Sequence, residues 1–219
     1  ATAKSFETDC KDEFYCMSSV EQFGITIDTK PVKWAIENKK ITNYHVSCYQ
    51  NNIKDIKKII KKCKLKKLYK KHPDIKMEEL LLGAIATLKS IQNNISKHIL
   101  LYLNTCENAN LIIKIINSLI KHNIFNLDSE LYCEALHSKT NLDFVSEVEQ
   151  FKKSKSGIIS SVYAFGEGFD LPELDSVVIV EKMSSDIRLV QSILRPNRLD
   201  KNNPDKIANI IIPTNINGV

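Results

Sequence analysis

Glycine, proline and arginine are scarce in this sequence. The 219 residues include six glycines, six prolines and three arginines, whereas isoleucine, asparagine and lysine are abundant. This bias is typical of an AT-rich genome and says nothing about the fold. Glycine matters most for function, because glycine-rich loops wrap closely around phosphate groups. The sequence contains no Gly-x-x-x-x-Gly-Lys-Ser/Thr segment, which excludes a phosphate-binding loop of that type.

Metal-binding and membrane-spanning patterns are absent as well. The six cysteines include no Cys-x-x-Cys pair, and the histidines near them lack ligand spacing, so we expect no metal site. The segment Ala1–Cys10 is polar, unlike a signal peptide, and no apolar run has the length of a bilayer span. We therefore expect an intracellular, reducing location, with no membrane partner.

The overall composition is that of a globular protein with a substantial core. Hydrophobic residues make up 43% of the chain and charged residues 26%. The formal net charge is +5 and the isoelectric point is about 8.8. This mildly basic balance permits a polyanionic partner without requiring one.

Apolar segments alternate with helical patterns in the second half of the chain. Such alternation predicts an α/β fold with a mostly parallel sheet and helices on both faces. The expected helices are 106–122, a helix that begins after Thr140 and reaches about 153, and 184–194. The expected strands are 97–103, 130–136, 157–162, 176–180 and 207–212, the last closed by Pro213.

The first half is less regular. We expect a strand over 41–49, a lysine-rich helical stretch over 52–71, and a helix from Pro73 to about 95. These patterns predict two parts: a linking segment over 1–95 and an α/β domain over 96–219. The lysines between Lys54 and Lys71 fit either a contact with nucleic-acid phosphates or the solvated face of an amphipathic helix.

Two segments carry candidate chemistry. In the run from Gly166 to Pro172, Gly168 permits close approach of a ligand, and the carboxylates Glu167 and Asp170 accept hydrogen bonds; a tight turn is the alternative. Farther on, Arg195 and Arg198 follow Gln191 at a helix end. Their guanidinium forks match phosphate oxygens, although basic residues also complement the carboxyl end of a helix.

Taken together and in order, these segments resemble the motifs of superfamily 2 helicases, in the branch related to restriction-enzyme motors. Val162–Pro172 resembles motif V, and the frame of Gln191, Arg195 and Arg198 resembles motif VI. Further matches include Ala1–Ala3 to motif III, Ile99–Asn104 to motif IV, and His137-Ser138 to a turn that faces nucleic acid.

The resemblance implies a RecA-like fold and a role for each matched residue. Arg195 and Arg198 would reach the γ-phosphate of ATP, and Gln191 would position the nucleotide or the attacking water. The residues that would bind or couple to the nucleotide are Glu167, Gly168 and Asp170. Those that would contact nucleic acid are Thr105, Ser138 and Lys139.

The same resemblance implies a partner domain. ATP and Mg²⁺ would bind only in a complete enzyme that also contains an N-terminal RecA-like domain, which we expect upstream of this chain. Asp12-Glu13-Phe14-Tyr15 resembles a DExx box but follows a polar stretch, so we interpret it as unrelated. The chain alone is thus expected to bind no cofactor and hydrolyse no ATP.

Departures from the motifs keep an alternative open. Leu194 stands where a glycine is usual, Pro196 follows the first arginine, and Val162 stands near the usual motif V threonine. The alternative is a non-catalytic nucleic-acid-binding or protein-docking module with the same fold. A third hypothesis is an unrelated nucleotide-binding α/β protein. The restriction-motor resemblance favours DNA over RNA. Together with the AT-rich codon bias, the motifs also make the chain similar to helicases of giant DNA viruses of the mimivirus type.

Overall fold

A six-stranded, all-parallel sheet forms the centre of the computed structural model, which describes residues 20–51, 53–127, 131–140, 143–162 and 171–215. The strand order is β1-β6-β5-β2-β4-β3. The strands are β1 (Tyr44–Asn51), β2 (His98–Tyr102), β3 (Leu131–Leu136), β4 (Ser156–Ser161), β5 (Ser176–Ile179) and β6 (Ala208–Asn215). The predicted α/β fold with a parallel sheet is confirmed.

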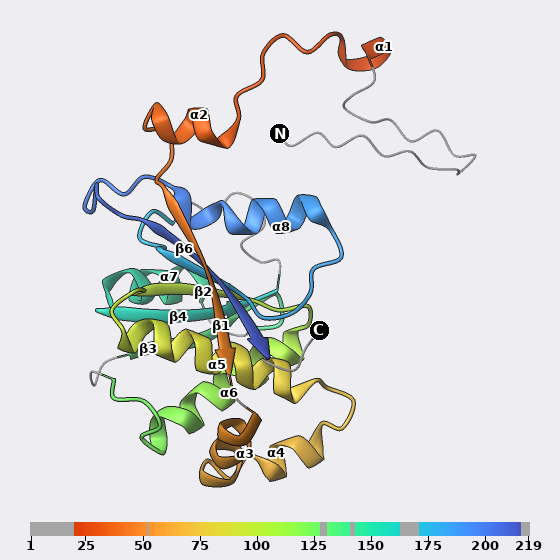
Figure 1. Ribbon diagram of the computed structural model, residues 1–219, viewed down its shortest axis with the longest axis vertical. Helices are drawn as coiled ribbons and strands as arrows, with labels where there is room; N and C mark the ends of the chain where they lie inside the picture. Colours follow the sequence, from red (N-terminus) through yellow and green to blue (C-terminus); the bar gives the residue numbers. More distant parts are fainter. Residues whose placement is uncertain (1–19, 52, 128–130, 141–142, 163–170, 216–219) are drawn as a thin grey trace.

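Helices cover both faces of this sheet (Figure 1). One face packs against α3 (Ile53–Lys62), α4 (Lys66–Lys71), α5 (Met77–Gln92) and α6 (Cys106–Lys121), and the other against α7 (Phe144–Lys153) and α8 (Asp186–Ile193). We call the core between the sheet and α3 to α6 the first core, and the core between the sheet and α7 and α8 the second core. Successive side chains of a strand point to opposite faces of the sheet. Ile99 and Leu101 therefore pack in the first core, and Leu100 and Tyr102 pack in the second. Two short helices, α1 (Val20–Phe23) and α2 (Val32–Glu37), precede the sheet.

The sheet and its core extend into the first 95 residues. Strand β1 pairs with β6 over its whole length, from Tyr44 opposite Ala208 to Asn51 opposite Asn215. Helix α5 buries Leu81, Ala84 and Ile85 almost completely. The division at residue 95 stays a prediction, but β1 and α5, which precede it, are integral to the α/β fold.

The helical pattern over 52–71 is interrupted. Helix α3 ends at Lys62 and α4 begins at Lys66, and between them Lys64 adopts a left-handed backbone with φ of 54°. The next helix begins at Met77 instead of at Pro73. Turns connect α4 to α5, and in them the His72 amide donates to the Tyr69 carbonyl.

The prediction that a helix begins after Thr140 is wrong. Helix α7 begins at Phe144, and its N-cap is Asp143, whose carboxylate accepts from the Val145 amide at 3.2 Å. The Thr140 hydroxyl is engaged elsewhere: it accepts from the His137 amide and donates to the Ala135 carbonyl. A local turn thus competes successfully with the helix for this hydroxyl.

Pro213 does not close the last strand. Strand β6 continues to Asn215 with Pro213 opposite Tyr49 of β1, whereas its pairing with β5 covers only 209–211. Proline lacks an amide donor. It is tolerated here because this part of β6 pairs with a strand on one side only.

Candidate functional site

The carboxyl ends of parallel strands meet at one edge of a sheet, where ligands of open α/β folds bind. Thr105 follows β2 there, and Ser138 and Lys139 follow β3; all three are exposed. Gln191 lies exposed on α8. The predicted residues Glu167, Gly168 and Asp170 lie between β4 and β5, outside the described residues.

The two motif VI arginines flank a buried anchor. The 3₁₀ turn η1 (Arg195–Asn197) follows α8, and both Pro196 and Asn197 are buried. The Asn197 side-chain amide donates to the Thr42 carbonyl at 2.8 Å, and the Thr42 amide donates to the Asn197 carbonyl at 2.8 Å. This reciprocal pair ties η1 to the segment before β1 and fixes the backbone between Arg195 and Arg198.

Tyr102 lies close to both arginines. It is buried at the end of β2, and burial raises the pKa of its hydroxyl, while the positive charges of Arg195 and Arg198 act in the opposite direction. Burial lowers the pKa of Arg195; Tyr102 opposes this shift and the neighbouring Arg198 adds to it. The charges of Arg195 and Arg198 therefore act on each other and on Tyr102, with Arg195 partly desolvated.

Lys206 holds the segment that leads out of the motif V region. Its side chain is buried, and its ammonium donates to the carbonyls of Pro172 and Leu174, the latter at 3.0 Å. Leu171 and Leu174 pack in the second core. The turn over 171–174 is therefore fixed on the sheet. Nothing in the local sequence around Lys206 indicates this role.

The serines near the motif V threonine position are structural. The buried Ser160 hydroxyl donates to the Ala109 carbonyl at 2.7 Å, and the buried Ser161 hydroxyl donates to the Leu136 carbonyl at 2.8 Å. Both hydroxyls are thus committed to contacts inside the fold.

Glu181 organises the amino end of α6. The Thr105 hydroxyl is the N-cap of α6 and accepts from the Asn108 amide at 3.1 Å. The carboxylate of Glu181, which follows β5, accepts from the Asn104 amide at 2.7 Å and from the Asn108 side chain at 2.8 Å. A carboxylate is favourable at a helix amino end, and here it engages the amide of Asn104, the residue before Thr105. Its position is set by tertiary structure and has no signal in the sequence.

His137 fixes the turn that carries Ser138 and Lys139. Its Nδ1 accepts from the Lys139 amide at 3.3 Å, which leaves Nε2 to donate to the Asn110 side-chain oxygen at 3.2 Å. Burial lowers the pKa of His137 from its ordinary value of 6.5, and the charge of Lys139 lowers it further. The neutral imidazole therefore holds the turn.

We expect this histidine to make the fold less stable in mild acid. Its folded-state pKa lies below the unfolded value, so its contribution is complete above pH 6.5 and is lost as pH falls through the folded-state pKa. Urea unfolding of wild type and His137→Gln at about pH 7.5 and pH 5 measures this difference. The drop in unfolding free energy should be larger in wild type; an equal drop in both proteins would contradict the assignment.

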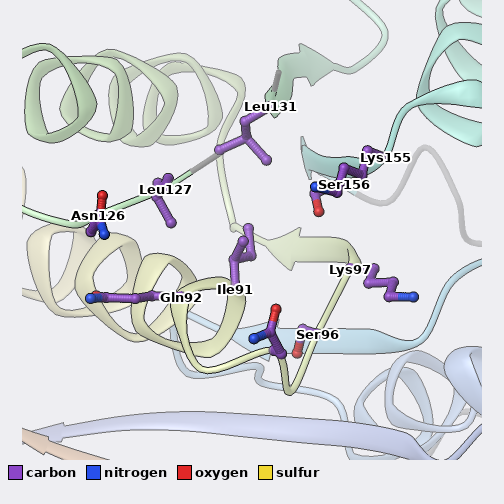
Figure 2. A pocket seen from close by; sticks show the side chains of 10 residues that line it. Ile91, Gln92, Ser96, Lys97, Asn126, Leu127, Leu131, Lys155 and Ser156 are labelled. Carbon is purple, nitrogen blue, oxygen red and sulfur yellow. The ribbon is translucent and has the colours of Figure 1, made fainter. Parts of the chain in front are cut away.

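A pocket lies at the opposite, amino edge of the sheet (Figure 2). Its volume is about 240 Å³. It is lined at the starts of β2, β3 and β4 by Lys97, Leu131 and Ser156, and by the end of α5. Beside it, the Asp175 carboxylate accepts from the Lys97 amide and from the Ser176 hydroxyl. Helicase motif residues do not line this pocket, so the candidate site is the carboxyl edge.

Two further searches cover the described part of the chain. No group of three or more His, Cys, Asp or Glu side chains there is arranged to hold a metal ion. None of the helices described combines the length and apolarity that a bilayer crossing requires.

Comparison with known families identifies the chain. Residues 76–200, more than half of the sequence, match the helicase conserved C-terminal domain. The chain belongs to this family of helicase C-terminal domains, and its fold is the RecA-like α/β fold. A search of curated proteins gives no match.

Solved structures with this fold include two restriction enzymes. The ATP-dependent Type ISP restriction-modification enzyme LlaBIII, bound to DNA, matches with a TM-score of 0.68 and 16% identity, covering 98% of this chain and 15% of that one. A fragment of an HsdR subunit of a type I restriction enzyme from Vibrio vulnificus YJ016 matches with a TM-score of 0.61 and 16% identity, covering 88% of this chain and 36% of that one. This chain thus spans well under two thirds of either protein. Viral origin stays a prediction.

Proposed function

We propose that this chain is the C-terminal motor domain of an ATP-dependent helicase or translocase that acts on DNA. Arg195 and Arg198 would contact ATP and Mg²⁺-bound phosphates held by an N-terminal RecA-like domain. The observation that carries the proposal is the buried anchor between the two arginines. An anchored backbone can hold two guanidinium groups ready for a phosphate without ordering them at each turnover.

This chain and the N-terminal domain would have different roles in hydrolysis, because they would contribute different residues to the ATP site. This chain has the arginines but no Gly-x-x-x-x-Gly-Lys-Ser/Thr loop, so hydrolysis would require a second domain that cradles the β- and γ-phosphates and Mg²⁺. Closure of two such domains around ATP, and reopening after hydrolysis, would change their spacing along a nucleic acid. Gln191, exposed on the helix before the arginines, would position the nucleotide or the attacking water.

Preference for DNA rests on resemblance. The motifs are similar to those of restriction-enzyme motors, and LlaBIII, which shares the fold, was solved bound to DNA. The exposed Ser138 and Lys139, at the end of the turn fixed by His137, and Thr105 are the proposed contacts with the phosphate backbone.

The test is the ATPase activity of the full-length protein with no nucleic acid, with duplex DNA, with single-stranded DNA and with RNA. Stimulation by DNA above that by RNA supports a DNA motor, and stimulation by RNA alone overturns the DNA assignment. Absence of hydrolysis under all four conditions, with the protein folded, would favour the non-catalytic binding or docking module. The 219-residue chain alone should show no hydrolysis in any of them.

A further inference from the structure

The exposed face of α3 and α4 carries an unusual concentration of positive charge. Residues 54–71 contain ten lysines and one aspartate, a formal charge of +9. The whole chain carries +5, so the remaining residues together carry −4. A genome-wide bias towards lysine codons would raise lysine along the entire chain. The segregation of charge into one segment needs a local cause.

The lysines are exposed, and most of them have no ion-pair partner among the described residues. Nine of them are described with their side chains and all nine are exposed: Lys57, Lys58, Lys61, Lys62, Lys64, Lys66, Lys67, Lys70 and Lys71. We call this set the lysine face. Within the described residues, Lys58 pairs with Asp55 at 3.3 Å, and no other member forms an ion pair.

The spacing of these lysines destabilises α3 and α4, because it places like charges next to each other. Lys57 and Lys61 are four residues apart, as are Lys58 and Lys62 on α3, and the same spacing recurs for 66 with 70 and for 67 with 71 on α4. Like charges at this spacing lie next to each other on a helix and destabilise it. A bound polyanion removes that repulsion.

The apolar side of the two helices is already occupied. Ile56, Cys63 and Leu65 are buried in the first core, and the Ser118 hydroxyl of α6 donates to the Cys63 carbonyl at 3.2 Å. Helices that bind membranes insert their apolar side into the lipid. Because that side is packed against α6 and the core here, the lysine face fits a hydrophilic polyanion better than a bilayer.

The lysine face is continuous with the candidate nucleic-acid site. His72, which follows α4, contacts the Glu107 carboxylate in the first turn of α6 at 2.8 Å. Glu107 lies two residues after Thr105, the N-cap of α6. Figure 1 shows α3 and α4 together at the end of the molecule below α6. A nucleic acid that contacts Thr105 can therefore continue onto α4 and α3.

We propose that the lysine face of α3 and α4 is a binding surface for the phosphate backbone of a nucleic-acid duplex, separate from the helicase motifs. Lysines contact phosphates as point charges, so this surface binds without regard to base sequence. It extends the proposed function by adding an anchor that works in the absence of ATP.

Salt-dependent binding of the 219-residue chain to a labelled DNA duplex, measured by fluorescence anisotropy without nucleotide, tests this proposal. The test variant carries Lys61→Gln, Lys62→Gln, Lys66→Gln and Lys67→Gln. The control variant carries the same four-charge change at exposed sites elsewhere: Lys39→Gln, Lys40→Gln, Lys153→Gln and Lys201→Gln. Glutamine keeps a helix propensity close to that of lysine, so far-ultraviolet circular dichroism should match wild type in both.

The test variant should bind about 100-fold more weakly than wild type near 0.1 M salt, with a log–log salt slope shallower by about 3 to 4. The control should stay within about threefold of wild type, because its lysines do not contact the duplex. Equal losses in both variants would show that only net charge matters and would overturn the proposal, as would unchanged binding by the test variant. Lysine-dependent binding to vesicles of phosphatidylserine and phosphatidylcholine, with none to duplex, would also overturn it. None of these readouts involves hydrolysis, so they are independent of the arginine assignment.

Discussion

Replacing Arg198 by alanine will reduce kcat for nucleic-acid-stimulated ATP hydrolysis by the full-length protein by about 10³-fold or more. Charge accumulates on the oxygens of the transferring phosphoryl group in the transition state, and a guanidinium neutralises it with a planar pair of donors. Alanine offers neither the charge nor the donors. The loss should fall on kcat, because the interaction is strongest in the transition state.

Two further variants sharpen this measurement. Arg198→Lys keeps the charge and loses the planar fork, so its kcat should lie between those of wild type and Arg198→Ala. Arg188→Ala is the matched control, because Arg188 is the remaining arginine of the chain and lies exposed on α8. It should stay within about threefold of wild type. A large loss in Arg188→Ala, or none in Arg198→Ala, would remove the catalytic assignment.

The strands were predictable because burial on both faces leaves a plain signal. Ile99, Leu100 and Leu101 are all nearly inaccessible, since helices cover both sides of β2. Such a strand is apolar without alternation, which distinguishes it from the amphipathic helices between strands. The order of the strands is another matter. That β6 lies between β1 and β5 depends on pairings between distant segments, and no local pattern encodes them.

The predicted helix boundaries were wrong where local hydrogen bonds or backbone conformation favoured another arrangement. Thr140 has the chemistry of an N-cap, but its hydroxyl is held by the turn of His137, so the cap is Asp143. Lys64 adopts a left-handed backbone that would ordinarily suggest glycine or asparagine. At Thr140 the deciding contacts are local hydrogen bonds to His137 and Ala135, which compete with capping of the helix.

The residues of the candidate site also form two groups: those that the sequence pattern predicts and those that only the structure reveals. Spacing alone predicts Gln191, Arg195 and Arg198 as site residues, because their order resembles a family motif, and their role stays a prediction. The residues that support them could not be found by spacing. Tyr102 comes from β2, and Thr42 lies 155 residues before its partner Asn197. Such supporting contacts form only when the sheet brings distant segments together, which is why spacing predicts candidate site residues but cannot find the residues that anchor them.

Asn197→Ala is expected to separate anchoring from chemistry. It removes the bond to the Thr42 carbonyl at a fully buried position, which should cost about 1–3 kcal/mol of unfolding free energy in the 219-residue chain. In the full-length protein, the freed turn would let Arg195 and Arg198 shift, and displacement of about 1 Å can cost about 10²-fold in rate. We therefore expect kcat to fall by roughly that factor with the KM for ATP little changed.

Matched variants decide whether this positioning role is real. Asn197→Asp keeps the shape but places a carboxylate oxygen against the Thr42 carbonyl, so it should be at least as damaging as alanine. Asn202→Ala removes an exposed side-chain amide. The hydrogen bond to the Asp200 carboxylate comes from the Asn202 backbone amide and is therefore kept. This variant should leave both stability and kcat near wild type. Urea unfolding and steady-state kinetics measure the two effects separately, at a temperature where every variant is folded. A loss of stability with full kcat would make Asn197 a structural residue only, and the arginines would then owe their placement to contacts with the ATP-binding domain.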